Sequence, residues 1–359
     1  MQNSLINEKF TTNIAFSESE NEPIAIIDCG ALKRNAKAIK KLLNTPFYAV
    51  VKSDAYGHGL IECARAVEGY CDGFAVGFVE EGVRLRLAGI FKPILCLLPP
   101  KNIFYAVMHD LEFAVHTVEY ATTVANFCKE RNLIAKVHIA VNSGMNRLGI
   151  DSIDELKQIL NLNSINFKIV GLFSHLYNGE NYNSSKQQLE KFLPFANECK
   201  RVNEKILLHI GASSALNLGR EFWLDFIRVG IAMYGYSAIN GTLRLEKVMK
   251  VVANKLQTRK INSGENLLYG DYKLLKSSSV TIYGYGYANG LRRNIKGALN
   301  CACMNLCAFE GMSDCVLIMS DANLQAKAEN TIPYEILTRY GLNCKKIYLD
   351  GDKDESNIR

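Results

Sequence analysis

The sequence has none of the segments that would mark a membrane or secreted protein. Its 359 residues contain no apolar stretch of about 18 or more, so we expect no membrane-spanning helix. Residues 1–22 lack a basic start followed by an apolar run, so they do not predict a secretory signal. We interpret residues 1–22 as a polar, flexible lead-in, and we expect a cytoplasmic protein without a membrane partner.

A strong excess of charge is also missing. Lysine and arginine number 42 against 36 acidic residues, which gives a formal net charge of +6. The basic residues are scattered along the chain, so the composition argues against a nucleic-acid-binding protein. Hydrophobic residues make up 48% of the chain, which is enough for one large domain and a smaller one.

Cysteine is abundant, but the signs of a metal site are missing. Eleven cysteines without a secretory signal are expected to be reduced thiols, many of them buried as small apolar side chains. Four of them lie close together in the sequence: Cys301, Cys303, Cys307 and Cys315. Their spacing matches no zinc pattern and no histidine lies nearby, so we predict no metal site.

The most regular feature present is an alternation of strand-like and helix-like segments over residues 23–240. Eight apolar, β-forming runs alternate with segments of helical spacing. These runs are FYAVVK (47–52), GFAVGF (73–78), PILCLL (93–98), FAVHT (113–117), KVHIAVN (136–142), IVGLFSH (169–175), LLHIGASS (207–214) and FIRVGIAMYG (226–235). Eight such units predict a closed (β/α)8 barrel with a parallel sheet inside. A further run, IAIID (24–28), precedes the first unit and leads into a predicted helix.

The pattern changes after residue 240. Residues 241–359 hold β-leaning runs separated by glycine, asparagine, serine and aspartate, and the one strong helical segment that we expect there is IPYEILTRYG (332–341). This composition predicts a second domain that is mostly antiparallel β.

Polar residues follow several of the predicted barrel strands, at the ends where barrel enzymes carry their chemistry. Lys52 ends the first strand, Ser174 and His175 end the sixth, Ser213 and Ser214 follow the seventh, and Arg228 and Gly230 lie in the eighth. A lysine amine can form a Schiff base, and a serine and glycine turn suits a phosphate, so the set points to pyridoxal phosphate. Taken alone, Lys52 favours a barrel lysine without chemistry, but together with the other residues at the strand ends it favours the cofactor.

The segment AVVKSDAYGHG (49–59) resembles the pyridoxal-phosphate lysine motif of bacterial alanine racemases. Other segments follow in the order of that family's motifs: NSGMNRLG (142–149), FSHLYN (173–178), HIGASSA (209–215), IRVGIAMYG (227–235), LLYG (267–270), GYANG (286–290), CMN (303–305) and YEIL (334–337). The resemblance spans residues 24–350 and both predicted domains. The C-terminal motifs are the more specific ones, because smaller pyridoxal-phosphate barrel proteins lack that domain.

The resemblance implies a fold, an activity and a set of roles. It implies interconversion of L-alanine and D-alanine for peptidoglycan, with Lys52 as cofactor anchor and one catalytic base and Tyr269 as the other base. Tyr269 would come from the second subunit of a homodimer with shared active sites. The remaining implied roles are Tyr56, Ser214, Gly230 and Ile231 at the phosphate, His175 on the cofactor ring, Arg228 at the pyridine nitrogen, His209 supporting Arg228, Arg147 near the phenolate oxygen, and Tyr287 and Met304 at the substrate site.

The sequence departs from the family pattern at a few positions. Many members carry a lysine, often as a carbamate, where this chain has Ala140, so Arg147 needs another anion such as chloride or a neutral partner such as Asn142. Asn142, Asn289 and Asn305 stand where aspartates are frequent.

Three other readings stay open: a racemase for another small amino acid such as serine, a decarboxylase of similar architecture, and a non-catalytic pyridoxal-phosphate carrier. Arg228 argues against the decarboxylase, and Tyr269 argues against the carrier. We interpret the other histidines as mainly structural: His58, His109, His116 and His138.

Overall fold

A computed structural model describes residues 21–236, 243–292 and 297–350. The predicted lead-in therefore lies almost wholly outside the described residues. The contacts within the chain divide it into two compact units. We call them the barrel unit, residues 27–249 with the chain end from Tyr348, and the β unit, residues 250–347 with the segment up to Ile26.

The barrel unit is built on eight parallel strands, which confirms the predicted barrel. Their order around the sheet is β8-β7-β6-β5-β4-β3-β2-β9. The circle is completed where Ala212, just after β8, forms a parallel bridge with Arg228 in β9. The strands are β2 (Phe47–Val50), β3 (Gly73–Val76), β4 (Ile94–Cys96), β5 (Glu112–Val115), β6 (Ala135–Ala140), β7 (Phe167–Phe173), β8 (Leu207–His209) and β9 (Ile227–Val229).

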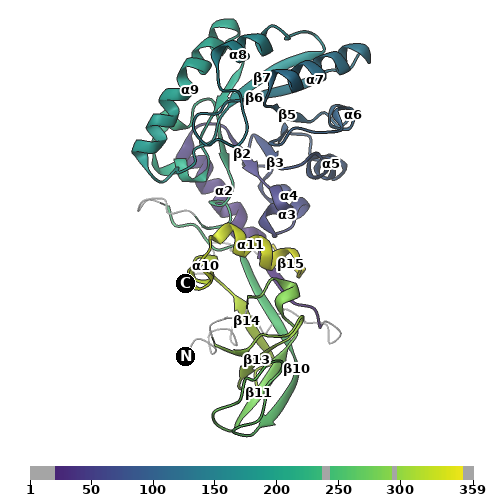
Figure 1. Cartoon of the computed structure of the whole chain (residues 1–359), viewed down its shortest axis with the longest axis vertical. Coiled ribbons are helices and arrows are strands. Elements are labelled where there is room, and N and C mark those ends of the chain that lie inside the picture. The colour runs from purple at the N-terminus through teal and green to yellow at the C-terminus, as the bar shows by residue number, and fades with distance from the viewer. Residues whose placement is uncertain (1–20, 237–242, 293–296, 351–359) are drawn as a thin grey trace, which may run out of the picture. The chain divides into compact units, whose positions relative to one another are not determined.

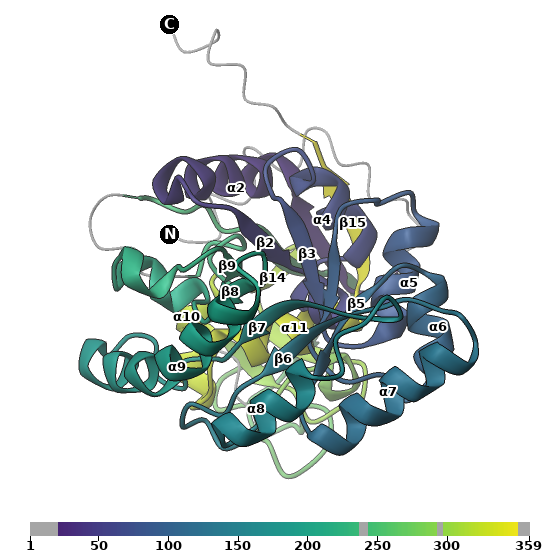
Figure 2. The same ribbon diagram turned by 90° about the horizontal axis from the view of Figure 1, so that it is seen from above.

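Helices lie around the outside of these strands, as Figure 2 shows for α5 to α8. Each helix packs one apolar face inward; α8, for example, buries Leu156, Ile159 and Leu160 and begins at a capping box formed by Ser152 and Glu155. The elements are α2 (Cys29–Leu43), the turn α3 (Lys52–Tyr56), α4 (Leu60–Val67), α5 (Val79–Leu87), α6 (Ile103–Met108), α7 (Val118–Glu130), α8 (Ile153–Leu160), α9 (Tyr182–Val202), and the 3-10 turns η1 (Ser213–Asn217) and η2 (Arg220–Phe222).

The β unit contains the second sheet, whose strands β10, β11, β13 and β14 are labelled in Figure 1. The path of the sheet is β12-β13-β11-β10-β1-β15, with β14 also paired to β10. The pairs β10–β11, β10–β14, β11–β13 and β12–β13 are antiparallel, as predicted. The strands are β1 (Ile24–Asp28), β10 (Met249–Ile261), β11 (Ser278–Tyr283), β12 (Ala298–Asn300), β13 (Cys307–Glu310), β14 (Cys315–Met319) and β15 (Lys345–Leu349).

Two elements differ from the sequence-based expectation. Strand β1, which falls inside the predicted barrel range, pairs in the second sheet instead. The predicted helix near the C-terminus is α11 (Pro333–Leu342), but it is preceded by α10 (Ala322–Glu329), which we did not expect. Helix α10 has only a weak apolar face, so periodicity does not reveal it, although Asp321 caps its start by accepting from the Asn323 N–H at 2.8 Å. A short 3-10 turn, η3 (Tyr287–Asn289), completes the β unit.

The cysteines of both units are free thiols, and all but Cys315 are buried. Burial raises the pKa of Cys71 and Cys344 to about 12, so these thiols are protonated at neutral pH. Within the described residues, no group of three or more histidine, cysteine, aspartate or glutamate side chains is arranged to hold a metal ion. No helix in the same part of the chain is long and apolar enough to cross a membrane.

Candidate active site

The candidate site begins at the tight turn that carries Lys52. Lys52 directly follows the Val50–Val51 end of the first barrel strand, and the next four residues, 53–56, all have φ between 53° and 55°. Left-handed backbone costs roughly 1–2 kcal/mol for each residue that has a Cβ. Other contacts must therefore hold this turn, and strain of this kind is often found at functional sites.

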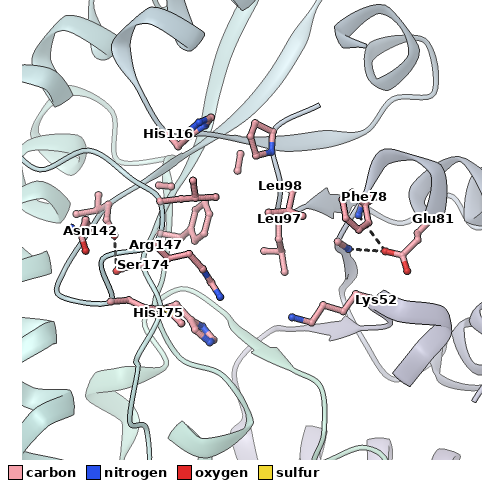
Figure 3. A pocket seen from close by; sticks show the side chains of 18 of the residues that line it. Lys52, Phe78, Glu81, Leu97, Leu98, His116, Asn142, Arg147, Ser174 and His175 are labelled. Carbon is pink, nitrogen blue, oxygen red and sulfur yellow. Dashed lines mark hydrogen bonds between the residues drawn. The ribbon is translucent and has the colours of Figure 1, made fainter. Parts of the chain in front are cut away.

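Glu81 in α5 provides those contacts. Its Oε1 accepts hydrogen bonds from the N–H groups of Ser53 at 2.5 Å and Asp54 at 3.3 Å. Its Oε2 accepts from the N–H groups of Gly77 at 2.8 Å and Phe78 at 3.2 Å, and Figure 3 shows the bond to Phe78. One carboxylate thus joins the turn after β2 to the end of β3, and this fixes the direction in which Lys52 projects.

The side chain of Lys52 lines a cavity of about 300 Å³ at the mouth of the barrel. Figure 3 shows the side chains of Arg147 and His175 reaching toward the Lys52 amine from the other side of this cavity. Burial lowers the pKa of Lys52, and the positive charges of Arg147 and Arg228 lower it further, while Glu81 opposes the shift. The surroundings therefore favour the neutral amine, which is the form that attacks a carbonyl or accepts a proton.

Arg228 in β9 is only 3% exposed and contacts Ser174 and His175, which line this cavity. Its Nη2 donates to the carbonyl oxygens of Ser174 at 2.8 Å and Ile210 at 3.3 Å, and to His175 Nδ1 at 3.3 Å. Burial, with the charge of Arg147, lowers the pKa of Arg228 to about 9, so the guanidinium is still charged at neutral pH.

His175 is held as a neutral ring by the same cluster. Burial comes first among the causes, followed by the charges of Arg228, Arg147 and Lys52, and together they lower the pKa of His175 to about 3. A neutral His175 whose Nδ1 accepts from Arg228 carries its proton on Nε2.

His209 in β8 supports Arg228 from the other side. Its Nδ1 accepts a hydrogen bond from Arg228 Nη1. The ring of His209 stacks between Phe173, at 5.1 Å between centroids, and Phe226, at 4.1 Å. Burial, followed by the charge of Arg228, lowers the pKa of His209, so this ring is also neutral. The structure thus brings together three predicted residues: His175, His209 and Arg228.

A second group of predicted residues meets at the turn after β9. A Cβ at Gly230 would lie 2.5 Å from Tyr56 Oη, and a Cβ at Gly179 would lie 2.0 Å from Ser214 Oγ, so a side chain at either position would displace the hydroxyl of Tyr56 or Ser214. Ser213 braces this turn because its Oγ accepts from the Gly230 N–H at 2.9 Å and from the Ala232 N–H at 3.2 Å. Within the described residues, the N–H of Ile231 donates to no protein acceptor.

The predicted residues of the C-terminal domain are exposed on the β unit. Tyr269 is 72% exposed in a tight loop, where Asn300 Nδ2 donates to the carbonyl oxygens of Tyr269 at 3.1 Å and of Leu267 at 2.6 Å. Tyr287 is 51% exposed and Met304 is 57% exposed. Tyr287 and Met304 lie close together, because the N–H of Ala288, the residue after Tyr287, donates to the Met304 carbonyl oxygen at 2.9 Å.

Ala140 and Asn142 lie in two different environments. Ala140 is buried in a small cluster with Ala114 and Phe173, and these three residues line the cavity. The Asn142 amide closes its own loop: it donates to Asp151 at 2.8 Å and accepts from the N–H of Asn146 at 2.9 Å. Asn142 therefore shapes the loop that carries Arg147.

Three residues around the site were not found from the sequence. Glu81 is the third residue of α5, the position at which a capping-box glutamate is found, so its place in the sequence could have marked it. Glu112 and His138 extend the hydrogen-bond chain beyond His209. We interpreted His138 as structural, and no sequence motif marks either residue.

The fold and the site together define the class of the protein: a (β/α)8-barrel enzyme with a separate β unit, in which a partly buried lysine amine faces two arginines at the barrel mouth. Residues 27–238 match the protein family described as alanine racemase, N-terminal domain. The chain belongs to the alanine racemase family, a family of pyridoxal-phosphate-dependent isomerases.

Individual relatives agree with this assignment. The chain is 36% identical over 289 residues to the alanine racemase of Clostridium novyi, covering 76% of this chain and 74% of that protein. The solved structure of the alanine racemase of Clostridium difficile 630 has a TM-score of 0.85 and 25% identity, with 92% of this chain and 96% of that chain covered. The alanine racemase of Bartonella henselae, solved with covalently bound pyridoxal phosphate, has a TM-score of 0.78 and 26% identity, with 92% and 100% covered.

Proposed function

We propose that the protein interconverts L-alanine and D-alanine with pyridoxal phosphate attached to Lys52. The observation that carries the proposal is the Lys52 amine, which lines the barrel-mouth cavity and has a pKa lowered by burial and by Arg147 and Arg228. When bound, pyridoxal phosphate supplies the electron-withdrawing ring that acidifies the α-hydrogen of an amino acid.

The residues present fit this cofactor. Gly230 and Gly179 leave room for the hydroxyls of Tyr56 and Ser214, which can donate to a phosphate, and Ile231 offers an N–H without a protein acceptor among the described residues. We assign the phosphate to Tyr56, Ser214, Gly230 and Ile231. The Gly230 N–H already donates to Ser213 Oγ, so Gly230 contributes by its lack of a side chain.

Arg228 favours racemisation over transamination. An arginine can only donate hydrogen bonds, so Arg228 would hold a pyridine nitrogen unprotonated and would make the ring a weaker electron sink. Weaker delocalisation favours return of the proton to the α-carbon of the amino acid. The fixed contacts of Arg228 with Ser174, Ile210 and His209 support this role, because they leave the guanidinium little freedom to move away.

Racemisation also requires proton transfer on both faces of the substrate. We assign one face to the Lys52 amine and the other to the Tyr269 hydroxyl of a second copy of the chain in a homodimer. The exposure of Tyr269 at 72%, in a loop fixed by Asn300, supports a role toward another subunit. Arg147, Tyr287 and Met304 would bind the substrate, and the D-alanine formed would supply peptidoglycan synthesis in the cytoplasm.

The test is conversion of L-alanine to D-alanine by the purified protein with added pyridoxal phosphate. We expect turnover by the wild type, none by Lys52→Ala and a large loss in Tyr269→Phe. Tyr272→Phe is the matched control, because Tyr272 is a 40% exposed tyrosine in the same loop. Turnover of L-serine in place of L-alanine would replace the substrate assignment, and cofactor binding without turnover of either would indicate a carrier.

A further inference from the structure

A continuous chain of hydrogen bonds runs from Arg228 through the barrel interior to a carboxylate. Arg228 Nη1 is bonded to His209 Nδ1, and His209 Nε2 lies 2.9 Å from His138 Nδ1. His138 Nε2 lies 3.0 Å from Glu112 Oε2. Glu112 is the first residue of β5, so the chain ends near the end of the barrel opposite the Lys52 cavity.

The direction of every bond in this chain is set from its two ends, by Arg228, which can only donate, and by the Glu112 carboxylate, which can only accept. A guanidinium can only donate, so His209 Nδ1 must accept, and the neutral His209 ring carries its proton on Nε2. That proton is donated to His138 Nδ1, so His138 also carries its proton on Nε2 and donates it to Glu112. Reversing any one bond would set two donors against each other at Arg228. Both rings are therefore required to be Nε2–H tautomers.

The surrounding structure is shaped for this chain. Both histidines have no solvent exposure, and the Glu112 side chain is 15% exposed. A Cβ at Gly171 in β7 would lie 1.9 Å from His138 Nδ1, so only glycine leaves room for the ring. The pairing of β6 with β7 also shifts register between Val137 and His138, where the strand adapts to this close approach.

Arg228 has a reason to need a distant carboxylate. Within the described residues it forms no ion pair, and its hydrogen-bond acceptors are two neutral rings and two carbonyl oxygens. An isolated buried charge is costly, and a polarised chain of hydrogen bonds can relay part of a counter-charge. Burial is the largest single influence on the pKa of Glu112 and works to raise it. The hydrogen bond and the electrostatic interaction with His138, together with the charge of Lys136, outweigh burial and lower the pKa, so Glu112 is ionised at neutral pH.

We propose that Glu112 is a positioning residue for Arg228: through His138 and His209 it fixes both ring tautomers and holds the guanidinium in place toward the site. The catalytic part of this inference rests on the proposed racemase function. The chain of hydrogen bonds ends on the carboxylate of Glu112. The other groups whose charges act on Glu112, or on which its charge acts, are Lys136, Asp110, Arg86, Tyr48 and Cys96.

The experiment uses the full chain labelled with ¹⁵N-histidine. The six histidines give a simple long-range ¹H–¹⁵N spectrum, in which a protonated Nε2 and an unprotonated Nδ1 are distinct for each ring. The variants are Glu112→Leu, which removes the terminal acceptor, and Glu112→Gln, which keeps an oxygen acceptor. Asp110→Asn is the matched control, because it removes an exposed carboxylate beside Lys136 at the same end of the barrel. Gly171→Ala displaces His138 without removing any polar group.

We expect Nε2–H tautomers at His138 and His209 in the wild type, Glu112→Gln and Asp110→Asn. Glu112→Leu and Gly171→Ala should lose this signature. With pyridoxal phosphate added, Glu112→Leu should lower kcat for alanine about tenfold at nearly unchanged KM and shift the absorption of the bound cofactor, while Glu112→Gln should stay within about threefold of the wild type.

A proton on Nδ1 of either ring in the wild type would overturn the inference. The inference would also be overturned if Glu112→Leu had the same histidine tautomers and the same kcat as the control Asp110→Asn. If Glu112→Leu does not fold, the inference is tested by the tautomers of His138 and His209 in the wild type and in Gly171→Ala. The spectrum needs no cofactor, so an absence of alanine turnover in the wild type would refute the proposed function and leave the tautomer result standing.

Discussion

The carboxylate of Glu81 offers the sharpest test of how the chain holds its lysine. Its two oxygens accept four backbone N–H groups, two from the turn after Lys52 and two from the end of β3. Glu81→Gln preserves the size of the side chain but leaves one oxygen. The amide nitrogen then faces two N–H donors that it cannot accept, so two of the four hydrogen bonds are lost.

The magnitude follows from the geometry. A hydrogen bond to a charged acceptor contributes about 1.5–3 kcal/mol, and partial exposure of Glu81 lets water replace part of this. We therefore expect the free energy of unfolding to fall by about 2 kcal/mol. The four left-handed residues store roughly 4–8 kcal/mol of backbone strain, so the weakened turn should relax and the Lys52 amine should move.

The chain contains a convenient reporter for this measurement. Its single tryptophan, Trp223, lies in the barrel unit, is 7% exposed and donates from Nε1 to the Ala215 carbonyl at 3.0 Å. Tryptophan fluorescence during urea or thermal unfolding therefore reports on the barrel. A loss of about 2 kcal/mol corresponds to a fall of about 4–8 °C in Tm for a unit of this size. Amide hydrogen exchange at Ser53 and Asp54 should also accelerate.

Glu80→Gln is the matched control. Glu80 is the adjacent exposed glutamate in the same first turn of α5, so it shares the interaction with the helix dipole, but its carboxylate accepts none of the N–H groups that Glu81 holds. We expect a change of less than about 0.5 kcal/mol for this variant. Equal shifts in the two variants, or unchanged exchange at Ser53 and Asp54 in Glu81→Gln, would refute the view that Glu81 holds the turn.

Three further predictions follow from the site. The lowered pKa of Lys52 means that the unfolded chain binds more protons than the folded chain between the folded pKa and about 10.5. Stability of the cofactor-free protein should therefore rise with pH in that window, and urea midpoints of Lys52→Met should lack this rise. Mixed dimers of Lys52→Ala and Tyr269→Phe should regain activity if the site is shared, because one of the two sites then has both residues; activity that stays lost would place Tyr269 elsewhere. Ser213→Ala leaves two buried N–H groups without an acceptor, so it should lower stability by about 1–3 kcal/mol and weaken pyridoxal-phosphate binding, measured by titration.

The barrel could be predicted because its signal is local and repeated. Each strand is a short apolar run, and each is followed by a segment with helical spacing, so errors at single elements do not disturb the pattern. Strand β1 shows where this reasoning stops: IAIID is as apolar as a barrel strand, and only its pairing with β10 and β15 places it in the other sheet. That pairing depends on residues more than 200 positions away in the sequence.

The candidate site also contains some residues that could be predicted from the sequence and others that could not. Lys52, His175 and Arg228 could be predicted because the ends of parallel strands meet at one rim. Glu112 and His138 could not, because their role depends on a ring nitrogen meeting a particular neighbour inside the barrel, and sequence spacing carries no such distance. A histidine in the middle of an apolar strand is compatible with a purely structural position, and only its contacts show otherwise.

The charges of the site support both roles that we propose for Lys52, binding a carbonyl and serving as a base. Lys52, Arg147 and Arg228 lie in one partly buried region, and the carboxylate of Glu81 is committed to four N–H groups. Before an anion binds, burial and the two arginines favour the neutral amine, which is the form that attacks a carbonyl. A bound phosphate or carboxylate would offset the arginine charges and raise the pKa of Lys52 again. The amine then gains a stronger affinity for a proton at the stage when proton transfer is required.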